Sequence, residues 1–107
     1  MLTVIETPIF QSMAQSLWTQ QEREDFAVFI SEQPLAGDVI PHTGGLRKLR
    51  WSRSGMGKRG GTRVIYYTRL PQGEVVLIAV YAKAKFDNLP AHVLKSWKEA
   101  YDEPSKD

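Results

Sequence analysis

The chain has 107 residues, of which 42% are hydrophobic and 24% charged, a length that fits one domain spanning 1–107. The absence of cysteine excludes disulfides, thiolate catalysis and cysteine-bound zinc, and favours an intracellular, reducing compartment. The opening residues lack the pattern of a signal peptide, and no run approaches the roughly 20 apolar residues of a membrane span. We therefore expect a cytoplasmic protein that does not interact with membranes.

The net charge of +2 hides a strong separation of charge along the sequence. All charged residues between Asp38 and Glu74 are basic, whereas the rest of the chain carries six basic and twelve acidic side chains. The eight basic residues of this central segment are Arg47, Lys48, Arg50, Arg53, Lys58, Arg59, Arg63 and Arg69. A segment of this kind attracts polyanions to one part of the molecule.

The N-terminal third predicts a strand followed by two helices. Residues 2–5 are β-branched or apolar, which favours a short strand at the edge or in the centre of a sheet. Apolar side chains at helical spacing follow at 10–17. Thr19 and Glu22 form a capping box at the start of a second helix, which ends at Gln33 before a proline. We expect the two helices to form a hairpin.

The middle of the chain predicts a connector and then three strands. Residues 34–45 combine prolines and glycines, which are typical of a connecting loop. Strands are expected at 46–51, 62–68 and 74–81, and a glycine-rich basic loop joins the first two. The turn at 69–73 fits an antiparallel hairpin between the last two strands.

A final helix completes the expected fold. We expect Asp87 or Asn88 to act as its N-cap, with Pro90 in its first turn. The order strand, two helices, three strands, helix predicts an α+β fold with a small, mainly antiparallel sheet. The two N-terminal helices and the C-terminal helix are expected to pack on one face of this sheet. The opposite face would then be free to carry the basic residues.

The first two of these strands carry the basic side chains with the clearest pattern. Strand alternation places Lys48 and Arg50 on one face, about 7 Å apart along the strand, with Arg47 on the other. Two cations this close repel each other unless an anion lies between them. Arg63 opens the next strand, where a guanidinium can bind two phosphate oxygens at once. Tyr66 could stack on a base, although it also fits a core position, as Arg47 fits an ordinary surface charge.

Further cations lie in the glycine-rich loop and after the last strand. In the loop, glycines surround Lys58 and Arg59, so that the backbone can approach a phosphate closely. It is not a Walker loop, because Lys58 is followed by another arginine rather than by serine or threonine. Arg53 fits either a contact with RNA or a solvated surface charge. Lys83 and Lys85 lie two residues apart, hence on one side of the chain.

These cations suggest cleavage of RNA without metal. The two histidines, His42 and His92, are far apart in the sequence, and no cluster has metal-ligand spacing, so neither a metal nor a cofactor is expected. RNA supplies its own nucleophile, the 2′-OH, whose attack on the phosphate needs a base, an acid and charge stabilisation. A lysine packed among cations can accept a proton closer to neutrality than its usual pKa of about 10.4 allows, whereas arginine stays charged.

The central segment of the sequence resembles that of a known family. Residues 37–67, GDVIPHTGGLRKLRWSRSGMGKRGGTRVIYY, closely resemble the signature stretch of HigB-like toxins in the RelE/ParE superfamily. The segment 80–89, VYAKAKFDNL, resembles their Y-G-K segment, and the resemblance spans nearly the whole chain. It implies a RelE-like fold and the toxin of a type II toxin–antitoxin system. Such a toxin is a metal-independent endoribonuclease that cleaves mRNA in the A site of the small (30S) ribosomal subunit.

The resemblance also implies roles and a partner. Lys48 and Arg50 correspond to a basic pair, Arg63 to a phosphate-binding arginine and Lys83 to the lysine of the Y-G-K segment, whereas Lys58 and Lys85 are assigned by position. The catalytic candidates are therefore Arg63, Lys48, Arg50, Lys83, Lys58 and Lys85. The candidates for contact with RNA or the ribosome are Arg47, Arg53, Arg59 and Tyr66. The implied partner is a HigA-like antitoxin with a helix-turn-helix domain, and it could cover the basic groove or block access to the ribosome.

Two departures from the family pattern leave questions open. Ala82 stands where glycine is usual, and Ala84 stands where the founding RelE branch has arginine, a role that Lys85 could take over. The general acid is not assigned, since neither Tyr81 nor Tyr101 is favoured.

Two other functions stay open at the level of sequence. ParE-like members of the superfamily share the fold but poison DNA gyrase. A basic domain could also bind RNA or DNA without any chemistry. The dense array of lysine and arginine favours the nuclease.

Overall fold

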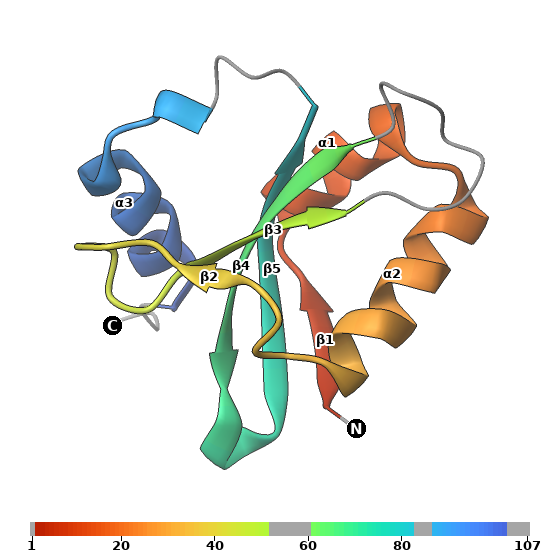
Figure 1. Cartoon of the computed structure of the whole chain (residues 1–107), viewed down its shortest axis with the longest axis horizontal. Coiled ribbons are helices and arrows are strands. Elements are labelled where there is room, and N and C mark those ends of the chain that lie inside the picture. Colours follow the sequence, from red (N-terminus) through yellow and green to blue (C-terminus); the bar gives the residue numbers. More distant parts are fainter. Residues whose placement is uncertain (1, 52–60, 83–86, 103–107) are drawn as a thin grey trace, which may run out of the picture.

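The computed structural model describes residues 2–51, 61–82 and 87–102, the side chain of the last residue excepted. In chain order the elements are β1 (Thr3–Glu6), α1 (Pro8–Leu17), α2 (Gln20–Glu32), β2 (Asp38–Val39), β3 (Arg47–Trp51), β4 (Thr62–Arg69), the 3-10 turn η1 (Leu70–Gln72), β5 (Glu74–Tyr81) and α3 (Ala91–Asp102) (Figure 1). Among the described residues, no helix is both long and apolar enough to cross a bilayer.

The strands form one sheet in the order β1-β5-β4-β3-β2. β1 is parallel to β5, and the other neighbouring strands are antiparallel, which confirms the expected α+β class with a mainly antiparallel sheet. The strands expected from the sequence are confirmed, with β1 at an edge. β2 was not expected, because it lies in the predicted connector. Its two residues, Asp38 and Val39, pair with Lys48 and Arg47, and two residues are too few to show a period in the sequence.

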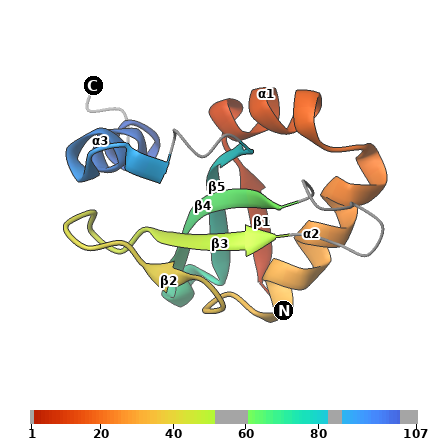
Figure 2. The ribbon, with the colours of Figure 1, turned by 45° about the horizontal axis from the view of Figure 1, so that its top comes forward.

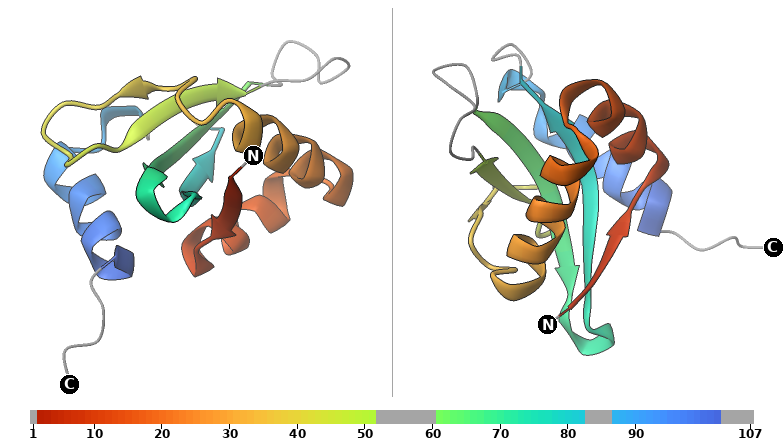
Figure 3. Two further views of the ribbon diagram at one scale, coloured as in Figure 1. Left: turned by 90° about the horizontal axis from the view of Figure 1, so that it is seen from below. Right: turned by 90° about the vertical axis from the view of Figure 1, so that its right-hand side faces the viewer.

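The helices cover both faces of the sheet, which corrects the expectation that all three pack on one face. Figure 3 shows α1 and α2 on one side of the sheet and α3 on the other. Val64 and Tyr66 of β4 pack in the cluster of α1 and α2, whereas Ile65 and Tyr67 pack in a second cluster with Leu94 of α3. Because β4 buries side chains in both directions, a single helical layer would leave half of them in water.

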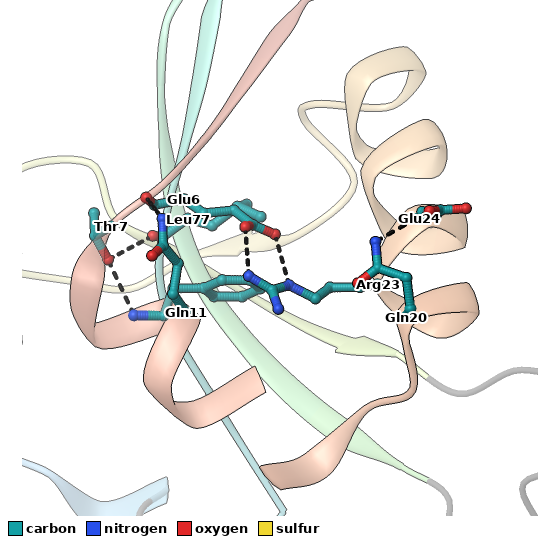
Figure 4. Close-up of polar contacts among 8 residues, drawn as sticks. Glu6, Thr7, Gln11, Gln20, Arg23, Glu24 and Leu77 are labelled. Carbon is teal, nitrogen blue, oxygen red and sulfur yellow. Dashed lines mark hydrogen bonds and ion pairs between the residues drawn. The ribbon is translucent and has the colours of Figure 1, made fainter. Parts of the chain in front are cut away.

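Side-chain caps start both N-terminal helices where the sequence predicts helices. Thr19 and Glu22 form the expected capping box at the start of α2. Thr7 caps α1 by accepting a hydrogen bond from the backbone N–H of Phe10, at 3.2 Å (Figure 4). The Thr7 hydroxyl also donates to the carbonyl oxygen of Leu77, at 2.9 Å. The start of α1 is therefore fixed to the interior strand β5.

An ion pair fastens the second helix to the sheet. Arg23 of α2 donates to both carboxylate oxygens of Glu6, with Nη2–Oε1 at 2.8 Å and Nε–Oε2 at 3.2 Å (Figure 4). The hydrogen bond to Glu6 raises the pKa of the Arg23 guanidinium above its usual value, against the opposing effect of burial. The side chain of Gln11 donates to the backbone carbonyl of Glu6, at 3.0 Å. These contacts join β1, α1 and α2 into one unit.

Helix α3 begins later than expected. Its first residue is Ala91, and the carbonyl of Pro90 accepts hydrogen bonds from the N–H groups of Val93 and Leu94, at 3.0 and 3.3 Å. Pro90 therefore precedes the first turn instead of lying within it. Asp87, expected as an N-cap, lies too far from this start to cap it, and its carboxylate binds side chains of the sheet instead.

At Gly37 the loop before β2 lies in close contact with the core, so a larger residue at this position is expected to destabilise the fold. Its N–H donates to the hydroxyl of the buried Tyr66, at 2.8 Å, and a Cβ here would lie 2.9 Å from that hydroxyl and 3.0 Å from the Lys48 carbonyl oxygen. Gly37→Ala is expected to lower the free energy of unfolding by about 1–3 kcal/mol, measured with urea, because the core must shift. Gly61→Ala is the control, since a Cβ there meets nothing within 4 Å. Equal stability of the two variants would contradict the predicted clash.

Candidate active site

The α3-facing side of β3 and β4 gathers three of the predicted cations. Lys48 lies opposite Ile65, and Arg50 lies opposite Arg63, in the antiparallel register of the two strands. Ile65 belongs to the cluster that packs with α3, so the alternation puts all three basic residues on that side. Figure 2 shows the two strands side by side. We call Lys48, Arg50 and Arg63 the cationic cluster.

Arg63 is the most enclosed member of the cationic cluster, with 14% of its side chain exposed. Its Nε lies 3.2 Å from Oδ2 of Asp87, and its Nη1 donates to the backbone carbonyl of Ala82, at 3.1 Å. A guanidinium has five N–H donors in one plane. Two contacts from different directions fix that plane and leave further donors for a planar or tetrahedral anion.

The other two cations are more accessible. The Nζ atom of Lys48 lies 3.8 Å from Oδ1 of Asp87, and 39% of its side chain is exposed. An ion pair this long and this exposed contributes little to stability. Arg50 is exposed, and within the described part of the chain it pairs with no carboxylate. Both side chains are therefore available to a ligand.

Asp87 is the anion between the cations, and sequence reasoning missed it. It receives Arg63 on one carboxylate oxygen and Lys48 on the other. The available signal was that Asp87 is the one acidic residue between Glu74 and Glu99. That signal does not show which residues the Asp87 side chain contacts. The sequence also fitted Asp87 as the N-cap of the last helix.

A β-bulge brings Tyr81 to the same side of the sheet. β5 has one extra residue, Ile78, between the partners of Ile65 and Tyr66. Because strand side chains alternate, an extra residue reverses the side to which all later ones point. Tyr81 therefore lies with the cationic cluster, and its hydroxyl donates to Oδ1 of Asp87, at 2.9 Å. Of the two tyrosines considered for the general acid, this one lies at the site.

The site keeps the Tyr81 hydroxyl protonated. Burial raises the pKa of Tyr81 far above its usual value, and the hydrogen bond to Asp87 and the negative charge of that carboxylate raise it further, whereas Arg63 lowers it. Burial also raises the pKa of Tyr66 in the core. At neutral pH, Tyr81 is therefore a neutral hydrogen-bond donor to Asp87.

Alkaline pH is expected to destabilise the fold through these two tyrosines. In the unfolded chain each ionises near its usual pKa of about 10, whereas folded Tyr66 and Tyr81 keep their protons. Above about pH 10 the unfolded state therefore holds fewer protons than the folded state, and the free energy of unfolding falls as pH rises. Urea unfolding between about pH 8 and about pH 11 measures this slope. Tyr81→Phe should flatten it, and a slope equal to that of the unchanged protein would refute the assignment.

Two predicted RNA-contacting residues lie on the other face of the sheet. Arg47 donates from Nη1 to the carbonyl of Gly37, at 2.6 Å, and so holds the loop before β2. Tyr66 is fully buried, so its ring has no free surface on which a base could stack, which corrects that expectation. Both side chains build the scaffold beneath the cationic cluster. The other predicted site residues lie outside the described residues: Lys58, Lys83, Lys85, Arg53 and Arg59.

The remaining candidates lie elsewhere or form no site. Tyr101 has the Arg69 guanidinium 5.7 Å from its ring centre, and Arg69 is six residues from Arg63 along β4, roughly 20 Å. Tyr101 is therefore remote from the cationic cluster. His42, in the loop before β3, and His92, in α3, are both exposed. In the described ranges no three metal-ligating side chains come together.

The architecture and its basic strand face define an α+β domain of RelE-like fold. The structure is similar to that of a mutant of the E. coli toxin RelE in the free state, with a TM-score of 0.63 and 14% identity over 91% of this chain and 96% of that chain. It is also similar to the isolated E. coli RelE toxin, with a TM-score of 0.56 and 13% identity over 81% of this chain and 93% of that chain. No profile of a known protein family matches the sequence. The expected RelE-like fold is confirmed, and the HigB-like branch stays a prediction.

Proposed function

We propose that this chain is the toxin of a type II toxin–antitoxin system and cleaves mRNA in the ribosomal A site without a metal ion. The observation that carries the proposal is the cationic cluster, in which two strands gather Lys48, Arg50 and Arg63 on one side of the sheet and one carboxylate pairs with Lys48 and Arg63. The similarity of the fold to the RelE toxin supports it.

The arrangement suits the charge that develops when RNA is cleaved. Attack of the 2′-OH on the adjacent phosphorus forms a new P–O bond and breaks the bond to the 5′ oxygen, leaving a 2′,3′-cyclic phosphate and a 5′ hydroxyl. The phosphate oxygens gain charge in the transition state, and fixed cationic donors stabilise it. Arg63, held by Asp87 and the Ala82 carbonyl, is the residue to which we assign this role.

The other basic residues would bind the RNA backbone and move the proton. Lys48 and Arg50 are accessible beside Arg63 and would contact neighbouring phosphates. The base that accepts the 2′-OH proton and the acid that protonates the 5′ oxygen would come from the lysines Lys48, Lys58, Lys83 and Lys85. DNA lacks the 2′-OH and would not be cleaved by this route.

The proposed regulation is by an antitoxin of the HigA-like, helix-turn-helix type. Such a partner would bind this chain in the cytoplasm and keep it from the ribosome. We therefore expect that expression of the antitoxin, encoded by the neighbouring gene, relieves growth arrest by the toxin. We also expect the two chains to copurify.

Primer extension on programmed ribosomes tests the proposed function. Purified protein is added to mRNA bound to ribosomes with a defined A-site codon, and in parallel to the same mRNA alone. New 5′ ends inside the A-site codon that form only when ribosomes are present would support the proposal. The same ends should form when the protein has first been treated with EDTA. Growth arrest with intact mRNA and damaged DNA would instead indicate a gyrase poison, and binding without cleavage would indicate a nucleic-acid-binding module.

A further inference from the structure

We propose that Asp87 is a positioning residue of the cleavage reaction, which fixes the guanidinium of Arg63 before RNA binds. The inference rests on the proposed function and extends it to a residue that does not itself touch the phosphate. Its basis is the convergence of two cations, Arg63 and Lys48, and of the Tyr81 hydroxyl donor on one carboxylate.

The two carboxylate oxygens of Asp87 have different partners. Oδ2 takes the Nε of Arg63, at 3.2 Å. Oδ1 accepts the Tyr81 hydroxyl at 2.9 Å and lies 3.8 Å from Lys48 Nζ. Because the buried tyrosine holds one oxygen, the carboxylate cannot rotate freely, and its other oxygen stays aimed at Arg63. The Ala82 carbonyl holds Nη1 of the same guanidinium, so Arg63 is held from two sides.

The same geometry argues against a role limited to helix capping or surface charge. Asp87 lies four residues before the first residue of α3, and its partners come from three strands, β3, β4 and β5. The pair with Arg63 is largely enclosed, with side-chain exposures of 14% and 28%. An ion pair shielded from water is screened less than an exposed one, so this pair holds the guanidinium of Arg63 more firmly than a surface pair would.

Removal of the Asp87 carboxylate should have opposite effects on RNA binding, through its charge, and on the cleavage rate, through its position. Asp87 places one negative charge among cations that would bind a polyanion, so its loss should strengthen binding to the ribosome and RNA. Its loss should also free the Arg63 plane, and misplacement of a catalytic group by about 1 Å can slow a reaction by roughly 100-fold. A positioning residue therefore gives slower cleavage together with equal or tighter binding. Damage to the fold cannot produce tighter binding.

The decisive experiment compares Asp87→Asn with the unchanged protein on programmed ribosomes. We expect the single-turnover cleavage rate at saturating ribosomes to fall roughly 10- to 100-fold. We expect the dissociation constant, measured with a 2′-deoxy residue in the A-site codon, to be unchanged or lower. In a nitrogen–proton correlation spectrum, the Nε–H signal of Arg63 should lose its protection from solvent exchange. A rate within about threefold of the unchanged protein, or affinity lost in parallel with rate, would overturn the inference.

Glu74→Gln is the matched control. Glu74 pairs with Arg69 at 3.1 Å, with side-chain exposures of 28% for Arg69 and 26% for Glu74, at the opposite end of β4 from Arg63. Like Asp87→Asn, this variant removes one negative charge that is paired with an arginine of β4. Its cleavage rate should nevertheless stay within about twofold of that of the unchanged protein. An equal loss of rate in Glu74→Gln would show that net charge, rather than the position of Asp87, determines the rate, and would overturn the inference.

Asp87→Glu keeps the inference testable if Asp87→Asn does not fold. The variant keeps the charge but moves the carboxylate by one methylene, so affinity should be unchanged and the rate should fall several-fold. A full cleavage rate in Asp87→Glu would overturn the positioning role. If the unchanged protein does not cleave mRNA on ribosomes, the proposed function itself fails, and that result is distinct from normal cleavage by both Asp87 variants.

Discussion

Arg63→Ala is expected to abolish detectable mRNA cleavage on programmed ribosomes, with a loss of at least about 100-fold, the usual effect of removing one donor that stabilises a charged transition state. The guanidinium is the most enclosed cation of the cationic cluster and is fixed by Asp87 and the Ala82 carbonyl. Affinity for ribosomes should fall much less, because phosphate contacts are distributed over several cations. Single-turnover primer extension and equilibrium binding measure the two effects separately.

Two further variants test whether the loss of cleavage is specific to the guanidinium of Arg63. Arg69→Ala removes an arginine from the other end of the same strand, where it pairs with Glu74, and cleavage should be nearly unchanged. Arg63→Lys keeps the charge but loses the planar pair of donors, so its rate should lie between those of Arg63→Ala and the unchanged protein. Equal cleavage by Arg63→Ala and Arg69→Ala would remove Arg63 from the proposed mechanism.

Local signals in the sequence were enough for most of the fold. Thr19 and Glu22 are three residues apart and satisfy each other's backbone groups, so the start of α2 depends on no distant contact. Strand alternation likewise placed Lys48 and Arg50 on one face of β3 and Arg47 on the other. The placement of α3 was wrong because the β4 pattern was interpreted with one buried face, whereas Ile65 and Val64 are both buried on opposite sides. A continuous apolar run on a central strand indicates two covering layers.

The candidate site was harder to predict because it depends on register. Strict alternation along β5 would put Tyr81 on the side of α1 and α2. The extra residue Ile78 reverses that side, and a bulge is set by pairing between strands rather than by any local composition. Asp87 raises the same difficulty, since its partners Arg63 and Lys48 are 24 and 39 residues earlier in the sequence. Sequence alone could predict the cations of the site, but not the anion that orders them.

Phe26→Ala is expected to lower the free energy of unfolding by about 3–5 kcal/mol, the usual effect of removing a buried phenylalanine ring. Phe26 is fully buried, and its ring centre lies 5.3 Å from that of Trp18 and 5.2 Å from that of Trp51. A domain of this size has a total stability of about 5–15 kcal/mol, so the variant should lose a large part of it. Urea unfolding followed by tryptophan fluorescence measures the loss directly.

Val28→Ala is the control for this prediction, because Val28 lies on the same helix and is 56% exposed; its effect should stay within about 0.5 kcal/mol. Trp51 belongs to β3, whose opposite face carries Lys48 and Arg50, so the aromatic contacts of Phe26 support the strand from which the cationic cluster projects. Cleavage by Phe26→Ala should therefore fall only in proportion to its folded fraction. Full stability of Phe26→Ala would mean that the cluster around Trp51 does not hold α2 on the sheet.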